Sequence, residues 1–167
     1  MPGKEMTPFV LYHEFHAPRK EVFNAFSEAD ALNEWWGPVD CRNTVIKLDF
    51  RPGGLFHFKM DFNGHISYGR FLFGRIERYD LLEFNNAFAD ENANAIPAPF
   101  DIKIPREIFY RLEFSEKAGK TILKLTGIPV NAQPEEEKGF ISIRESMQQG
   151  FASTFDKLRE YLSGLQS

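Results

Sequence analysis

The sequence predicts a single α+β domain in which a long C-terminal helix lies across a curved antiparallel sheet. Three observations lead to this fold class. Apolar and polar residues alternate with a period of two through much of the segment 43–88, as in half-buried strands. Apolar residues near the C-terminus recur at helical spacing, and the connections between the predicted strands are too short to hold crossover helices. The strands should therefore run antiparallel, with the helix packed on one face of the sheet.

The first part of the chain predicts one strand followed by two short helices. Residues 9–16 are rich in aromatic and β-branched side chains and are ended by Pro18, so they read as a strand. Residues 19–26 carry apolar side chains at helical spacing. Ser27 is a suitable N-cap for a second helix that runs through Trp35.

Six further strands are predicted in the rest of the chain. The clearest alternation lies in residues 55–61, where Phe56, Phe58 and Met60 share one face and His57, Lys59 and Asp61 the other. Asn63-Gly64 is a strong hairpin signal after it. The six predicted strands are residues 45–49, 55–61, 65–77, 81–88, 108–114 and 121–128.

The strand at 65–77 leaves its face assignment open. Tyr68 and Arg70 share one parity, and Phe71 shares the other with Phe73. A bulge at Gly69 or Gly74 would switch the faces, so the sequence does not decide which set points inward.

Two further segments lack strand periodicity, and a last helix completes the chain. Residues 89–106 are rich in Asn, Ala and Pro and predict a long loop, which in a small domain is more often a lid or a contact surface than filler. Residues 129–137 predict a polar connection. A last helix then runs from about Ile141 to Leu162, with one apolar stripe formed by Met147, Phe151, Phe155, Leu158 and Leu162.

Composition limits the classes of protein to which the chain can belong. Its 167 residues fit one domain, 1–167, with no repeat and no second domain. The net charge of −4 is mild and mixed along the chain, which argues against a nucleic-acid partner. The single cysteine, Cys41, excludes a disulfide within the chain, and no apolar run is long enough for membrane insertion. We therefore expect a cytoplasmic protein.

The predicted layout requires the sheet to curl around the helix. Seven strands about 4.8 Å apart make a sheet roughly 34 Å wide, whereas a helix is only about 10 Å across. Aromatic side chains make up 15% of the chain, so the space between helix and sheet is filled either by these rings or by a bound molecule. Both interpretations stay open, and a small hydrophobic molecule is the partner that the second implies. The candidate ligand-binding residues are Trp36, Phe56, Phe58, Met60, Tyr68, Arg70, Phe84, Tyr110, Leu112, Met147, Phe151 and Phe155.

Several motifs occur in an order and spacing typical of one family. Trp35 and Trp36 are followed directly by Gly-Pro, and an Arg-Pro-Gly-Gly turn comes next along the chain. The motifs are His16–Phe26 (HAPRKEVFNAF), Glu34–Pro38 (EWWGP), Asp49–Gly54 (DFRPGG), Ser146–Phe151 (SMQQGF) and Lys157–Leu162 (KLREYL).

From Phe9 to Leu162 the chain resembles the family related to the activator of heat-shock protein 90 ATPase, within the SRPBCC superfamily. The START lipid-transfer domains and the birch-pollen-allergen proteins belong to the same superfamily. The resemblance implies a helix-grip fold with an internal hydrophobic cavity. Trp35, Trp36 and the Pro52-Gly53-Gly54 turn look structural rather than catalytic. The loop at 89–106 departs from the usual pattern and would alter a cavity mouth or a dimer face.

No motif points to a metal, a cofactor or a catalytic set. The four histidines lack the spacing of a zinc helix, and neither a nucleophile elbow nor a phosphate loop is present. Three polar residues lie near the helix stripe, namely Glu145, Gln148 and Gln149. One of them could serve as a polar anchor in a cavity.

Three functions stay open on the sequence. The first is a carrier or sensor that binds a small hydrophobic or amphipathic ligand without catalysis. The second is an enzyme of the cyclase or hydratase type, which would need an ionisable pair such as Arg70 with Glu145 inside the cavity. The third is a co-chaperone-like interaction module, which the family resemblance implies, although the chain lacks the additional N-terminal domain of the eukaryotic co-chaperones. A homodimer also stays open.

Overall fold

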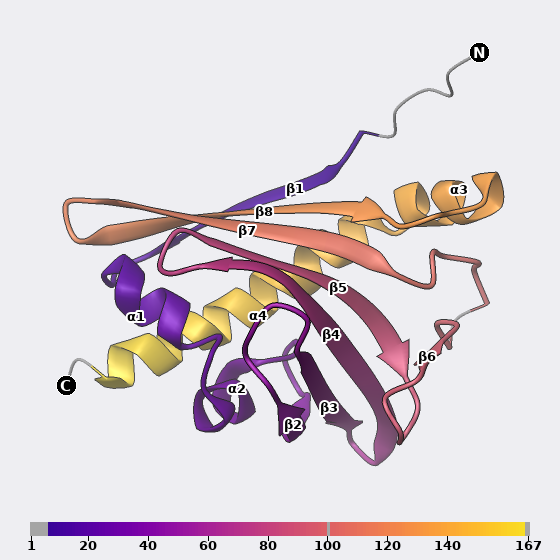
Figure 1. Ribbon diagram of the computed structural model, residues 1–167, viewed down its shortest axis with the longest axis horizontal. Helices are drawn as coiled ribbons and strands as arrows, with labels where there is room; N and C mark the ends of the chain where they lie inside the picture. The colour runs from indigo at the N-terminus through magenta and orange to yellow at the C-terminus, as the bar shows by residue number, and fades with distance from the viewer. Residues whose placement is uncertain (1–6, 100, 166–167) are drawn as a thin grey trace.

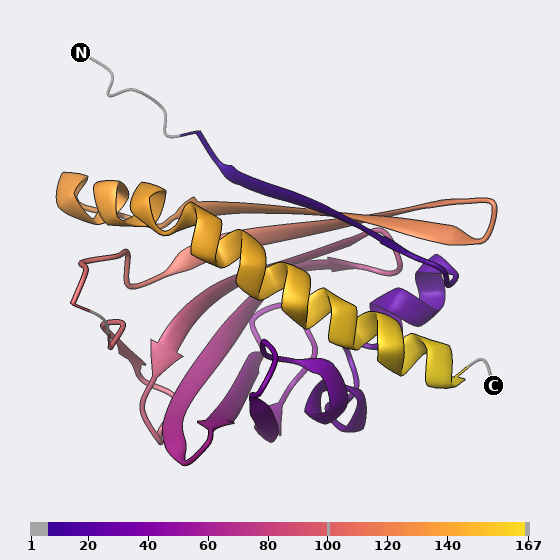
Figure 2. The ribbon, with the colours of Figure 1, turned by 180° about the vertical axis from the view of Figure 1, so that it is seen from behind.

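One curved antiparallel sheet and four helices make up residues 7–99 and 101–165, which the computed structural model describes. The long helix lies across the sheet (Figures 1 and 2). The order of elements matches the predicted one, with an additional short strand and an additional helix. The elements are β1 (Phe9–Phe15), α1 (Arg19–Asn24), α2 (Ala29–Trp35), β2 (Arg42–Leu48), β3 (Leu55–Phe62), β4 (His65–Glu77), β5 (Leu81–Ala89), β6 (Ala95–Ile96), β7 (Ile108–Lys117), β8 (Lys120–Pro129), α3 (Pro134–Ser142) and α4 (Arg144–Leu165).

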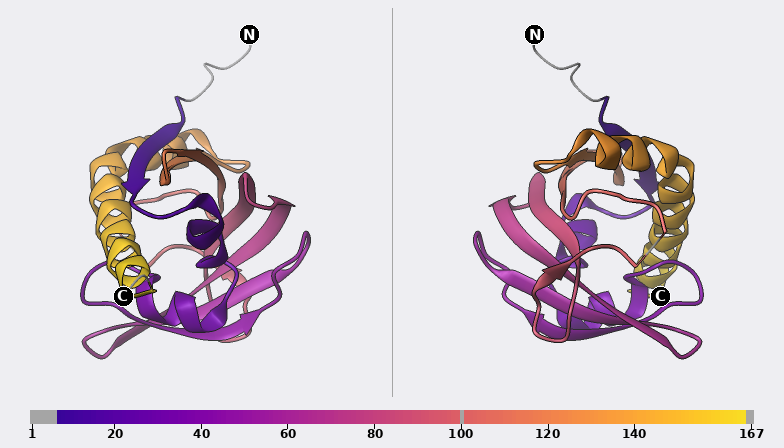
Figure 3. Two further views of the ribbon diagram at one scale, coloured as in Figure 1. Left: turned by 90° about the vertical axis from the view of Figure 1, so that its left-hand side faces the viewer. Right: turned by 90° about the vertical axis from the view of Figure 1, so that its right-hand side faces the viewer.

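The sheet has the order β1-β8-β7-β5-β4-β3-β2, and β6 pairs with β5 outside this path. Every pair of strands is antiparallel. In the end-on views the strands curl around an interior that α4 covers from one side (Figure 3). The seven predicted strands are confirmed. The two residues of β6 are too few to show a period of two, so the sequence placed them in a loop.

Ser27 does not cap the second helix. Helix α2 begins at Ala29 with Glu28 at the cap position, and no side chain makes a cap hydrogen bond there. The Ser27 hydroxyl instead donates to the carbonyl oxygen of Asn24, at 3.0 Å, at the end of α1. The residue type suits both roles, because a serine hydroxyl also bonds to carbonyls three residues earlier.

The predicted C-terminal helix corresponds to α4, which begins at Arg144 rather than at about Ile141. A further helix, α3, precedes it and begins where the sequence predicted a polar connection. Helix α3 starts with a capping box in which the Gln133 side chain accepts from the backbone of Glu136, and Glu136 accepts from the backbone of Gln133, at 2.8 Å. Pro134 occupies the first helical position. The sequence Gln-Pro-Glu-Glu is this start signal, which the polar composition of the segment concealed. In α4 the apolar stripe is confirmed, with Phe155, Leu158 and Leu162 fully buried against the core.

The register of β4 with its neighbours settles the face that the sequence left open. Phe71 pairs with Phe56 and packs in the core with Phe73, so this parity points inward. A Cβ atom on Gly69 would lie 2.5 Å from the ring of Phe58, which covers this position. Gly74 lies at the register shift between Phe73 and Ile76, so the predicted bulge is present there and keeps Ile76 packed against the core.

The outer face of β3 is less exposed than its alternation predicts. His57 is only 4% exposed, and its Nε2 atom lies 3.0 Å from the carbonyl oxygen of Asp90. Asp90 begins a turn in which its carboxylate accepts from the backbone of Asn92 and of Asn94, at 2.9 Å each. This turn carries the chain back over the outer face, where His57 receives a partner that a solvated histidine would not need.

Candidate ligand-binding site

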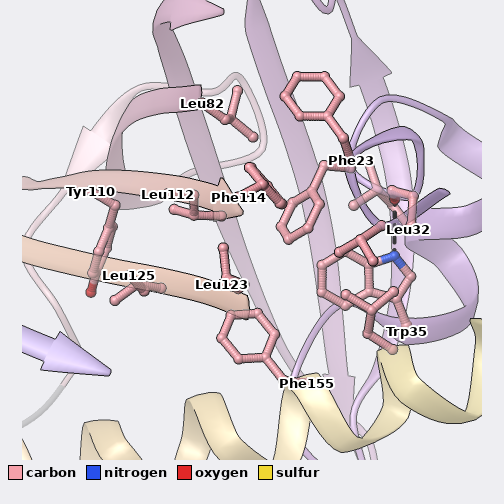
Figure 4. Close-up of a cluster of buried hydrophobic side chains, with 14 of the residues drawn as sticks. Phe23, Leu32, Trp35, Leu82, Tyr110, Leu112, Phe114, Leu123, Leu125 and Phe155 are labelled. Carbon is pink, nitrogen blue, oxygen red and sulfur yellow. Dashed lines mark hydrogen bonds between the residues drawn. The ribbon is translucent and has the colours of Figure 1, made fainter. Parts of the chain in front are cut away.

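We call one part of the interior the closed part, because its side chains, which include Trp35, Leu123 and Phe155, are buried and pack against one another. Trp35 is completely buried, and its indole nitrogen donates to the carbonyl oxygen of Ala25 at 3.0 Å. Figure 4 shows this bond and the ring of Phe155, which points from α4 toward Leu123 on the sheet. Trp35 and Phe155 lie 6.5 Å apart between ring centroids. The one polar atom of the Trp35 side chain has a hydrogen-bond partner, and its apolar atoms are enclosed. This part of the interior is therefore packed like an ordinary protein core.

Six of the predicted ligand-binding residues belong to such packed surroundings and are at most 3% exposed. The rings of Phe71 and Phe84 stack at 3.9 Å, and Phe84 contacts Tyr110 at 5.7 Å between centroids. Burial raises the pKa of Tyr110 above its ordinary value of 10, so its phenol stays neutral. At these positions the protein's own side chains, five aromatic rings and one leucine, fill the core. The positions are Phe56, Phe58, Phe84, Tyr110, Leu112 and Phe155.

Four other predicted residues are packed against the core but keep part of their surface exposed, and we call these residues together the open part of the interior. They are Trp36, Met60, Met147 and Phe151. Met147 and Phe151 lie one turn apart on α4, and Phe151 contacts Phe9 and Tyr110 at 6.0 and 5.4 Å between centroids. On the side of the sheet, Trp36 follows α2 and Met60 lies on the inward face of β3.

Trp36 differs from Trp35 in its polar atom. Its ring meets Phe58 and Phe71 edge-on at 5.9 and 5.1 Å. Its indole nitrogen is buried without a hydrogen-bond partner among the described residues. A buried donor without a partner costs about 1–3 kcal/mol, so this position is suited to a group that supplies an oxygen acceptor.

Contacts from α4 fix the loop that follows Trp36. The ammonium group of Lys157 donates to the carbonyl oxygens of Gly37, Pro38 and Cys41 at 3.1, 3.4 and 3.3 Å. The Ser153 hydroxyl accepts from the backbone of Val39 at 2.8 Å. Burial lowers the pKa of Lys157. The place of Trp36 beside the sheet is thus tied to the helix opposite.

A pocket of about 650 Å³ opens at the start of α4, and Met147 forms part of its wall. Its volume lies within the range of small-molecule sites, roughly 300–1,000 Å³. The apolar lining comes from Pro99, Ile102, Ile143 and Met147, and Asp101 and Ser146 add polar atoms. Three of these residues come from the segment 89–106, which the sequence predicted to be a lid or a contact surface without indicating any of its residues.

Two predicted residues do not face the interior. The register places Tyr68 opposite Lys59, and Arg70 opposite His57, on the outer face of the sheet. The guanidinium of Arg70 donates to the carbonyl oxygen of Ala93 at 3.0 Å and lies 3.8 Å from the Glu107 carboxylate. Their parity is opposite to that of Phe71, and the bulge at Gly74 comes too late to reverse it.

Neither the predicted ionisable pair nor the predicted polar anchors lie in the interior. Arg70 is paired with Glu107 on the outer face, and Glu145 is exposed on α4. Gln148 and Gln149 are exposed as well. Their helical positions turn them away from the stripe of Met147 and Phe151.

A curved antiparallel sheet around a long C-terminal helix, with two short helices after the first strand, is the helix-grip fold of the SRPBCC superfamily. The family model described as "Activator of Hsp90 ATPase homolog 1-like protein" matches residues 16–163. The chain therefore belongs to this family.

Solved structures support the same fold. A solution structure of a protein from Arthrobacter aurescens is 25% identical with a TM-score of 0.79, covering 96% of this chain and 88% of that one. Protein Ms6760 from Mycobacterium smegmatis is 21% identical with a TM-score of 0.75, covering 95% and 91%. The AHSA1 protein from Silicibacter pomeroyi is 18% identical with a TM-score of 0.71, covering 96% and 100%. None of the curated proteins compared with the sequence matches it.

In the part of the chain that the structure describes, no helix is both long enough and apolar enough to cross a membrane.

Proposed function

We propose that the protein binds a small apolar or amphipathic molecule, without catalysis, in the open part of its interior. The observation that carries the proposal is the pocket of about 650 Å³ whose wall includes Met147. Met147 lies one turn from Phe151 on the helix face that packs against the core. A ligand that entered there would contact Met147, the residue that the pocket lining shares with the open part.

The chemistry of the surroundings supports an amphipathic ligand. Trp36 offers an indole N–H that has no protein acceptor among the described residues. The exposed Ser146 and Asp101 add polar atoms to the outer pocket. A molecule with an apolar body and an oxygen atom toward Trp36 would satisfy the buried donor and cover the apolar walls.

Binding of the fluorescent amphipathic probe 1-anilinonaphthalene-8-sulfonate tests this proposal. We expect saturable binding to the native protein and at least about tenfold weaker binding to Met147→Glu, because the added carboxylate repels the sulfonate of the probe and loses water when the probe covers it. Gln149→Glu is the matched control, since it adds the same charge to an exposed position of α4. Native mass spectrometry of the purified protein should also show a co-purified ligand. Absence of saturable binding, or equal loss in both variants, would overturn the proposal.

The family match supports a second candidate, a co-chaperone-like interaction with a heat-shock protein 90 chaperone. Its test is the ATPase rate of the chaperone with and without the protein. Stimulation that persists in Met147→Glu would favour this function and separate it from ligand binding. An unchanged rate, together with no retention of the chaperone in a pull-down, would reject it.

A further inference from the structure

The pocket beside Met147 has an outer wall that includes Asp101 and Ile102, and the position of this wall depends on contacts outside the pocket. Ile102 contributes a side chain to the pocket lining. The backbone of the next residue, Lys103, rests against α3 at Gly139, which is buried. Because Ile102 and Lys103 are consecutive, whatever holds Lys103 also places the Ile102 side chain.

The contact at Gly139 leaves no space for a side chain. A Cβ atom there would lie 1.8 Å from the carbonyl oxygen of Lys103 and 3.3 Å from the Cγ2 atom of Ile102. Backbone atoms cannot rotate away as the end of a side chain can, so the wall would have to retreat by at least about 1 Å to reach van der Waals distance. Glycine is therefore required here by close approach of two backbones.

A second contact holds the ends of the segment that includes the wall. On the outer face of the sheet, Arg70 donates to the carbonyl oxygen of Ala93 at 3.0 Å and lies 3.8 Å from the carboxylate of Glu107. Its side chain is only 18% exposed. One guanidinium thus joins the start of the segment 93–107 to its end, on the rigid base of β4.

We propose that Gly139 and Arg70 are positioning residues for the ligand pocket, and that by placing Ile102 they set the length of apolar ligand that the pocket accepts. This inference rests on the proposed function. Gly139 fixes the distance between the outer wall and the α3–α4 corner, where Ile143 and Met147 complete the lining. Arg70 holds the two ends of the segment 93–107 together on the outer face of the sheet.

The first test compares Gly139→Ala with Gly150→Ala, a matched control in α4 where an added Cβ meets nothing within 4 Å. The probes are saturated fatty acids of increasing chain length, measured by displacement of 1-anilinonaphthalene-8-sulfonate. In the native protein, affinity should rise by up to about fourfold per added methylene until the pocket is full. In Gly139→Ala the wall stands farther out, so the plateau should move to longer chains by one or two methylenes, while Gly150→Ala keeps the native plateau. A uniform loss of affinity at every length, or an unchanged plateau, would overturn the inference.

The second test needs no ligand, so it separates this inference from the proposed function. Hydrogen exchange should speed up at least about tenfold in residues 93–107 of Arg70→Met and stay unchanged in the adjoining strands. The control is Arg75→Met, which removes an exposed arginine of the same strand that pairs with Glu77. Equal exchange in Arg70→Met and Arg75→Met would overturn the role of Arg70. If the native protein binds no fatty acid but the exchange result holds, the proposed function fails and Arg70 remains the anchor of the segment.

Discussion

The closed and open parts of the interior contain the same kinds of side chain, but these side chains differ in how completely they are buried and hydrogen-bonded. Phe155 and Phe151 lie one turn apart on α4, yet Phe155 is 1% exposed and Phe151 keeps part of its surface accessible. Trp35 and Trp36 are neighbours in the chain, yet of the two only Trp35 has a partner for its indole N–H among the residues that the structure describes. Aromatic content alone therefore does not separate the packed core from the proposed site. The two differ in burial and in the indole N–H of Trp36, which has no partner among the described residues.

The largest expected effect separates the two phenylalanines of α4. Phe155→Ala should lower the free energy of unfolding by about 3–5 kcal/mol, because it leaves a cavity in a fully packed region. Phe151→Ala removes a ring that is already partly exposed, so its loss should be no more than about half as large. Urea denaturation of both variants measures the difference. Equal losses would mean that the open part is packed as tightly as the closed part.

A smaller effect separates the two tryptophans. Trp35→Phe should cost about 1–3 kcal/mol, because it leaves the Ala25 carbonyl oxygen without its donor and removes core volume. Trp36→Phe removes an unpaired donor, so the free energy of unfolding should stay the same or rise slightly.

The same pair of variants also distinguishes stability from binding. Trp36→Phe should weaken binding of 1-anilinonaphthalene-8-sulfonate about three- to tenfold, since it deletes the N–H offered to an acceptor. Trp35→Phe should leave the probe affinity within about twofold when measured well below its unfolding midpoint. The reverse ranking would place the polar contact of the site elsewhere.

The smallest expected effect concerns pH. Burial and then the charge of Arg159 lower the pKa of His13 from its ordinary value of 6.5, against the opposing influence of Asp156 at 3.5 Å. The native protein thus binds fewer protons here than the unfolded chain as the pH falls below about 6.5. The stabilising contribution is present above that pH and is lost as the pH falls through the lowered pKa.

Chemical denaturation between pH 8 and 5 measures this contribution. His13→Leu should show a shallower loss of stability on acidification than the native protein. His65→Leu, at an exposed position, is the control and should keep the native slope. A native slope in His13→Leu would assign the acid sensitivity to other groups.

The sequence predicted the sheet and the α4 stripe because burial on one face imposes a repeating pattern, as at Phe56 and Phe58 in β3. It missed the start of α3 because the capping box at Gln133 lies in a polar segment. It left the face of Arg70 open and included Arg70 among the candidate ligand-binding residues, because parity within one strand does not say which face is covered. Only the pairing of β4 with β3 decides that. Ile102 and Gly139 carry no local pattern, since their meeting depends on tertiary contact between a loop and a distant helix.

Methyl NMR during a titration with 1-anilinonaphthalene-8-sulfonate shows which side chains of the protein the probe contacts. If the open part binds the probe, the methyl signals of Met147, Ile102 and Met60 should shift together along one saturable binding curve. Those of Ile46 and Ile66, which are exposed on β2 and β4, should not follow that curve. Shifts that are confined to Ile46 and Ile66, or that grow without saturation at all five residues, would contradict binding in the open part.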